Sequence, residues 1–127
     1  MIYLIALILL LTNSYQTKDD NQLIEIERRD GKVMQFEEIG RSEKADGKMI
    51  KTLPAIIKGG FFHLHFNKVS EITFGMPKDT TITANVKWMS SKQTKLDVIK
   101  DKLTCKMGDE VVVLPLEAVR KIKFVRE

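Results

Sequence analysis

The chain has 127 residues, of which 43% are hydrophobic and 30% are charged, and its net charge is +4. This size fits one compact domain or two very small ones and excludes a large multidomain enzyme. A single cysteine, Cys105, excludes an internal disulfide framework and a cysteine-rich zinc module, because both need several sulfur atoms at fixed spacing.

The first residues have the pattern of an export signal. Residues 1–11, MIYLIALILLL, carry no charged side chain, and a polar run follows over residues 12–22. As a helix the apolar run would be about 16 Å long, which is too short for a hydrocarbon core about 30 Å thick. We expect a signal peptide and leader over residues 1–17, with Thr12 and Ser14 near the cleavage point. The alternatives are an uncleaved membrane anchor and a buried first strand.

Cleavage would leave a secreted or periplasmic protein with no transmembrane span. In such an oxidising compartment an odd cysteine is either buried and inert or reactive. Cys105 alternates with Leu103 and Met107, which predicts that it lies on the core-facing side of a strand. We expect an inert thiol, with a redox or cross-linking role as the alternative.

The chain contains an internal repeat. Residues 61–74, FFHLHFNKVSEITF, align with residues 111–124, VVVLPLEAVRKIKF, and residues 26–39 align with residues 86–99. The apolar positions of the first alignment coincide one for one: Phe61/Val111, Phe62/Val112, Leu64/Leu114, Phe66/Leu116, Val69/Val119, Ile72/Ile122 and Phe74/Phe124. We therefore expect two related β repeats, over residues 18–74 and 75–127.

The first copy is longer than the second because of an insert within residues 40–58. Ala45-Asp46-Gly47 is a turn signal, which predicts a longer hairpin or a surface loop. The insert also holds apolar residues that either cover their own core or form a contact patch for another protein. These are Met49, Ile50, Leu53, Ala55, Ile56 and Ile57.

Each copy is predicted to be all-β. Residues 23–28 alternate polar and apolar side chains, Asp30-Gly31 is a hairpin turn, and residues 32–39 form the return strand. The second copy repeats this plan over residues 82–88 and 93–98, with Met89-Ser90-Ser91 in place of the Asp-Gly turn. No stretch shows the 3.6-residue period of a long helix.

The order of these elements over residues 23–124 resembles the small SH3-like or Sm-like β-barrel. The resemblance is carried by Asp30-Gly31 and by a closing pattern that occurs twice: Phe66/Val69/Ile72/Phe74 and Leu116/Val119/Ile122/Phe124. It implies two small barrel or β-meander repeats packed together, either as separate barrels or as one fused sheet. It implies no activity, because function depends on the site and not on the scaffold.

Few residues suggest catalysis. His63 and His65 flank Leu64, so on a strand their side chains point to the same face and their Cα atoms lie about 6.6 Å apart. Two histidines at this distance form half of a possible metal site. Together with Phe61 they are otherwise the outward face of that strand. No Gly-x-Ser-x-Gly elbow is present, and the adjacent acidic pairs of the chain would point to opposite faces of a strand. We expect no catalytic residue, cofactor or resident metal.

The positive charge is concentrated in the second copy. Lys100, Lys102 and Lys106 alternate on one predicted strand, and Lys121 and Lys123 alternate on the last. If these strands are neighbours, a basic stripe results, with Trp88 as its nearest aromatic residue. The alternative is a solvated strand face whose lysines discourage edge pairing.

Together these features predict an exported, non-catalytic binding or assembly module of the bacterial envelope. Its candidate binding elements are the insert, the strip of Phe61, His63 and His65, and the lysine stripe with Trp88. The expected partner is an envelope protein, or else an anionic polymer or lipid, and export argues against nucleic acid. The alternatives are a scaffold subunit without its own ligand and a small metal-dependent enzyme that uses His63 and His65.

Overall fold

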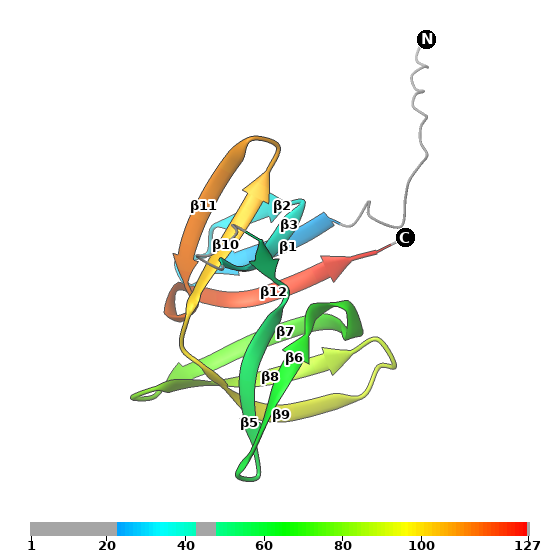
Figure 1. Cartoon of the computed structure of the whole chain (residues 1–127), viewed down its shortest axis with the longest axis vertical. Coiled ribbons are helices and arrows are strands. Elements are labelled where there is room, and N and C mark those ends of the chain that lie inside the picture. The colour runs from blue at the N-terminus through cyan, green and yellow to red at the C-terminus, as the bar shows by residue number, and fades with distance from the viewer. Residues whose placement is uncertain (1–22, 43–47, 127) are drawn as a thin grey trace.

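A computed structural model describes residues 23–42 and 48–126, and this part of the chain consists of β-strands and two short 3₁₀ turns (Figure 1). The predicted all-β class is confirmed, and no α-helix occurs among the described residues. The predicted leader over residues 1–17 and the Ala45-Asp46-Gly47 turn lie outside them.

The first copy contributes seven strands and one turn: β1 (Leu23–Arg28), β2 (Val33–Phe36), β3 (Glu38–Ser42), β4 (Met49–Ile50), β5 (Thr52–Ile57), β6 (Gly60–His65), η4 (Phe66–Lys68) and β7 (Val69–Pro77). The second copy contributes β8 (Thr81–Trp88), β9 (Gln93–Ile99), β10 (Lys102–Met107), β11 (Glu110–Pro115), η5 (Leu116–Ala118) and β12 (Val119–Val125). The series β6, η4, β7 in the first copy has the same order as β11, η5, β12 in the second.

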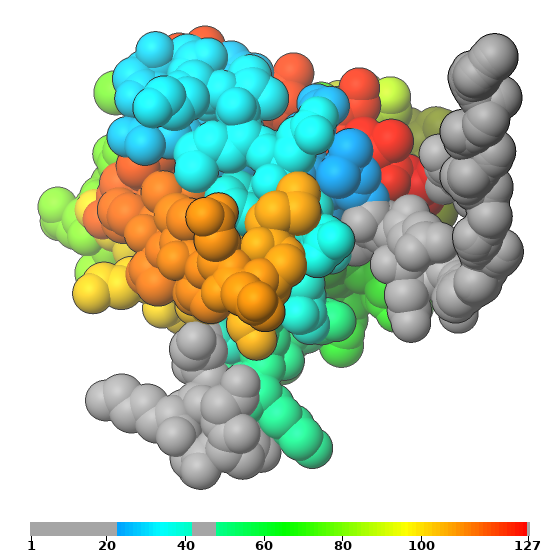
Figure 2. Space-filling model, turned by 90° about the horizontal axis from the view of Figure 1, so that it is seen from above, coloured from blue at the N-terminus to red at the C-terminus, as the bar shows by residue number. Residues whose placement is uncertain are grey.

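The two copies exchange strands instead of forming separate sheets. An eight-stranded sheet has the order β2-β1-β12-β7-β8-β9-β5-β6, and a four-stranded sheet has the order β11-β10-β3-β4. The first strand of the described residues therefore pairs with the last one. In Figure 1 the blue and cyan strands lie with the orange and red ones, and the green strands lie with the yellow one. Figure 2 likewise shows the cyan and orange segments side by side on one surface.

The pairing of β7 with β12 lies at the centre of this exchange. The register sets Thr73 opposite Lys121, Ile72 opposite Ile122, and Glu71 opposite Lys123. Ile72 and Ile122 occupy the same place in the two copies, so a pseudo-twofold axis passes between them. Both side chains are fully buried, which joins the cores of the two halves.

The insert supplies both a hairpin strand and a core strand. β4 pairs with β3, and β5 lies between β9 and β6, with Leu53 and Ala55 fully buried. The other apolar residues of the insert are half-buried. Arg41 holds the place where the chain crosses between the sheets: its Nε donates to the Thr52 carbonyl at 2.8 Å, and its Nη1 lies 3.5 Å from Asp101 Oδ2.

The hairpin turns of the two copies have the same geometry despite their different sequences. In the first, the Gly31 N–H donates to the Arg28 carbonyl at 3.0 Å, and in the second the Ser91 N–H donates to the Trp88 carbonyl at 2.9 Å. The φ angle is +92° at Gly31 and +75° at Ser91. Because side chains disfavour this left-handed region, the serine is strained where the glycine is not.

Replacing Ser91 by glycine should therefore stabilise the protein. We expect Ser91→Gly to raise the free energy of unfolding by about 0.5–1 kcal/mol, measured by urea denaturation. Ser90→Gly, one residue earlier and without a positive φ, is the matched control and should give no gain. A loss of stability in Ser91→Gly would contradict the assigned turn geometry.

Candidate functional site

The lysines of the predicted stripe lie on two different sheets. Lys102 and Lys106 are on β10 in the four-stranded sheet, whereas Lys121 and Lys123 are on β12 in the eight-stranded sheet. Lys100 lies between β9 and β10. The strands are not neighbours, so the condition for one continuous basic stripe is not met.

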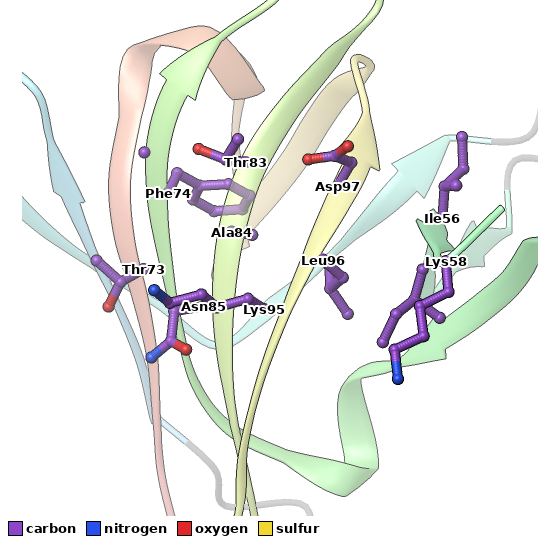
Figure 3. Close-up of a pocket in the computed structure, with 12 residues that line it drawn as sticks. Ile56, Lys58, Thr73, Phe74, Thr83, Ala84, Asn85, Lys95, Leu96 and Asp97 are labelled. Atoms are coloured by element: carbon purple, nitrogen blue, oxygen red, sulfur yellow. The ribbon is translucent and has the colours of Figure 1, made fainter. Parts of the chain in front are cut away.

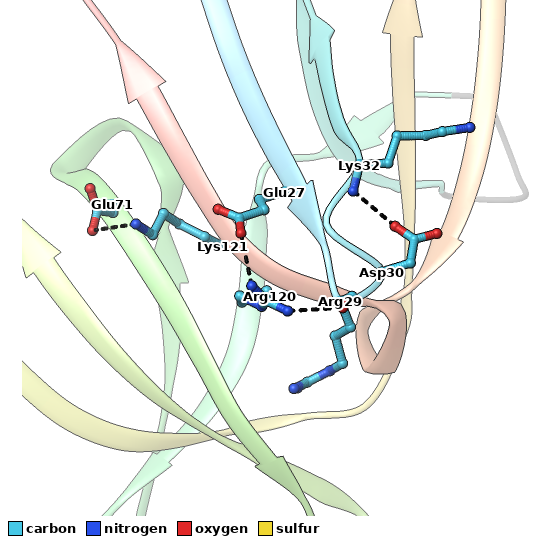
Figure 4. Close-up of polar contacts among 7 residues, drawn as sticks. All are labelled: Glu27, Arg29, Asp30, Lys32, Glu71, Arg120 and Lys121. Atoms are coloured by element: carbon cyan, nitrogen blue, oxygen red, sulfur yellow. Dashed lines mark hydrogen bonds and ion pairs between the residues drawn. The ribbon is translucent and has the colours of Figure 1, made fainter.

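The lysines of β12 face acidic side chains of the first copy. Lys123 lies opposite Glu25 on β1 and Glu71 on β7, and Lys121 lies opposite Glu27. Figure 4 shows the Lys121 Nζ to Glu71 Oε2 contact at 4.0 Å and, next to it, Arg120 Nη1 at 3.0 Å from Glu27 Oε2. Strand exchange therefore compensates the positive charge of the second copy on this face.

Trp88 is held in place by the fold. Its side chain is half-buried against the core, and its indole N–H donates to Thr94 Oγ1 at 2.9 Å. A stacking platform for a ligand needs a free aromatic face, so Trp88 is placed less favourably than the exposed rings of β6.

The strip of Phe61, His63 and His65 lies exposed on β6, which ends the eight-stranded sheet. The Phe61 side chain is 60% exposed, and its ring meets the His63 ring edge-on with centroids 5.3 Å apart. On β5, Ile56 lies opposite Phe61 and Pro54 lies opposite His63. We call Pro54, Ile56, Phe61 and His63 the aromatic face of the β5–β6 hairpin.

The two histidines are not joined by further ligands in the part of the chain that the structure describes. No group of three or more His, Cys, Asp or Glu side chains there is arranged to hold a metal ion. The cross-strand neighbours of His63 and His65 are Pro54 and Thr52. The aromatic face therefore offers apolar and aromatic contacts, with the His63 imidazole within it and His65 next along the same side of β6.

An open groove of about 660 Å³ adjoins this face (Figure 3). Its residues come from β7, β8 and β9 and from the end of β5: Thr73, Phe74, Gly75, Thr83, Ala84, Asn85, Lys95, Leu96, Asp97, Ile56, Ile57 and Lys58. Phe74, Ala84 and Leu96 form one cross-strand row and are buried. Successive side chains of a strand point to opposite faces of the sheet. The two cross-strand rows that flank this buried row therefore point to the other face and form the walls of the groove.

The walls of the groove are polar and carry unpaired positive charge. Asp97 Oδ2 lies 3.4 Å from Lys78 Nζ, and Asn85 Nδ2 donates to Gln93 Oε1 at 2.9 Å. Lys58 and Lys95 have no carboxylate within ion-pair distance among the described residues. The groove can thus receive an anionic group, and Ile56 belongs both to it and to the aromatic face.

Sequence reasoning missed the groove and half of the aromatic face. Both depend on β5, for which the sequence predicts either a longer hairpin or a surface loop, with apolar residues that cover their own core or form a contact patch. The structure shows the hairpin, with Leu53 and Ala55 in the core. The alternation of Leu53, Ala55 and Ile57 before Lys58-Gly59 was the signal for a hairpin strand. The pairing of β5 with β9 of the other copy had no comparable signal.

No protein-family model and no curated protein sequence matches this chain. Among residues 23–42 and 48–126, no helix is long and apolar enough to cross a membrane.

Cys105 is fully buried, as predicted, and burial raises the pKa of its thiol to about 12. Because the thiolate is the reactive form, Cys105 should resist thiol reagents in the folded protein at pH 8 and react at least a hundredfold faster in urea. The thiol ionises at lower pH in the unfolded chain than in the folded protein. Ionisation of Cys105 should therefore lower the free energy of unfolding progressively as pH rises from about 9 to 12. Equal labelling rates with and without urea would contradict this environment.

Proposed function

We propose that this chain is an exported, non-catalytic binding or assembly module and that its partner is another protein. The observation that carries the proposal is the aromatic face on β6, an edge strand at the end of the larger sheet. An unpaired edge strand with exposed apolar side chains can pair with a strand of another chain. Monomeric proteins usually prevent this by covering the edge or by placing charged side chains on it.

The opposite sheet supports the same function. β11 is the edge of the four-stranded sheet, and Val111 and Val113 on it are 55% and 53% exposed. The fold thus presents two apolar edges, one at the end of each sheet. Export is supported by the apolar, uncharged run of residues 1–11, which would place the partner in the cell envelope or outside it.

We further propose that each half of the fold is SH3-like in the order of its elements. A hairpin, an apolar strand, a 3₁₀ turn and a closing strand occur in both halves, with η4 and η5 at equivalent places. Each half takes its first hairpin from one copy and its closing strands from the other, so that the two SH3-like units are exchanged. This supports the fold-level resemblance without adding an activity.

The test is capture of proteins from the native envelope by the purified chain and by two variants. Phe61→Thr removes the exposed ring from β6, and Val33→Thr, the matched control, changes an equally exposed apolar residue on β2. We expect at least one protein to be retained by the wild-type and Val33→Thr chains and reduced tenfold or more with Phe61→Thr. Identical captured sets for all three chains would contradict the proposal.

A further inference from the structure

The open edge of β6 presents a defined set of backbone groups. The hairpin turn Lys58-Gly59 is closed by the pair Ile57 and Gly60, and in antiparallel pairs hydrogen-bonded and non-hydrogen-bonded positions alternate from there. Gly60, Phe62 and Leu64 therefore bond to β5. The N–H and C=O groups of Phe61, His63 and His65 point away from β5 into the open edge, where no described residue accepts or donates to them.

The equivalent strand of the second copy has protective features that β6 lacks. β11 pairs with β10 in the same register, so its outward-pointing positions are Val111, Val113 and Pro115. Pro115 has no N–H, and Glu110 adds a charge to that strand. β6, with the sequence GFFHLH, contains no proline and no Asp, Glu, Lys or Arg. Proline and charge are two devices that block further pairing at an edge, and β6 has neither.

The surroundings of β6 are positively charged. Residues 48–70 contain four lysines and two histidines and no aspartate or glutamate. Lys51 is paired with Glu38 of β3 at 3.0 Å, whereas Lys58 and Lys68, at the two ends of β6, have no carboxylate within ion-pair distance in the described part of the chain. A second copy of this edge would oppose like charges, whereas an acidic strand would be attracted.

We propose that β6 binds an extended, acidic segment of the partner protein by strand addition. The added strand would accept hydrogen bonds from the outward N–H groups of Phe61, His63 and His65 and donate to their carbonyls, while its acidic side chains lie near Lys58 and Lys68. This is a recognised mode of peptide binding, in which backbone bonds supply affinity and flanking side chains supply specificity. The inference rests on the proposed function and names the chemistry of the partner.

The probe is a ten-residue peptide of alternating valine and glutamate, labelled at one end, with binding to the purified protein measured by fluorescence anisotropy. A valine–lysine peptide of the same length tests charge. A valine–glutamate peptide methylated on alternate backbone nitrogens tests the backbone bonds. We expect the lysine and methylated peptides to bind at least tenfold more weakly, and equal binding of either one would overturn the proposal.

His65→Pro is the matching variant of the protein. The φ angle of His65 is −83°, close to the value of about −65° that proline fixes. Pro115 occupies the equivalent place on β11 with φ −68°. The substitution removes one outward N–H and leaves the β5 pairing intact, so it should weaken peptide binding about tenfold without changing the circular dichroism spectrum. Pro115→His on β11 is the control and should leave peptide binding unchanged. Undiminished binding by His65→Pro would overturn the proposal.

Two outcomes distinguish a failure of the strand-addition proposal from a failure of the proposed protein-binding function. If Phe61→Thr loses its envelope protein but no acidic peptide binds, strand addition of an acidic segment is wrong and the binding function stands. If neither effect occurs, both proposals fail. A concentration-dependent dimer in analytical ultracentrifugation that His65→Pro abolishes would identify a second copy as the occupant of the edge, which also overturns the acidic partner.

Discussion

The antiparallel pairing of β7 with β12 is the contact on which the rest of the structure depends. At its centre the side chains of Ile72 and Ile122 are paired and buried. On the other face of the sheet, acidic and basic side chains alternate in a row across the strands. In that row Glu25, Lys123, Glu71 and Lys87 follow one another across β1, β12, β7 and β8. A slip by one residue would turn the isoleucines outward, and a slip of the charged row would lose opposite-charge neighbours, so burial and charge specify the same register.

Because the closing strands of the two copies meet in this way, neither half of the fold is made by one copy. β1 requires β12 as its neighbour, β3 requires β10, and β5 requires β9. A unit of about fifty residues buries too little surface to be more than marginally stable alone, whereas interleaved copies share one core. The exchange also brings carboxylates of the first copy to the basic side chains of β12, in the pairs Arg120–Glu27 and Lys121–Glu71.

The local features of the fold, including the first hairpin of each copy, could be predicted from the sequence, and the pairings between the two copies could not. Alternation of side chains marked the buried faces, including that of Cys105, and the repeat marked the equivalent closing strands. Alternation says which side of a strand meets a core, but it does not say which strand lies beside it. For that reason the sequence allows a single basic stripe formed by the lysines of β10 and β12, although these strands lie on different sheets. For the same reason the groove, whose walls come from both copies, could not be foreseen.

The exposed edges follow from the same arrangement. Because the copies exchange strands, every strand from β1 to β9 in the larger sheet has a neighbour on both sides, and β6 lies at the end of that sheet. The extra residues of the first copy lead into β4, whereas β5, which follows, is the counterpart of β10 in the second copy. Residues 48–70, which include β5 and β6, carry lysine without acid. This edge lies beside a groove in which Lys58 and Lys95 have no carboxylate partner among the described residues. It is the part of the described structure best suited to hold another chain.

The strand exchange itself is tested most directly by cutting the chain between the copies. A protease site placed in the turn between β7 and β8, near Asp79, would allow the folded protein to be cleaved into its two copies. Interleaved strands predict that the pieces stay together in gel filtration and unfold in one transition, and that each piece is unfolded when isolated. Separation of the pieces into two folded units, each with its own thermal transition, would contradict the account.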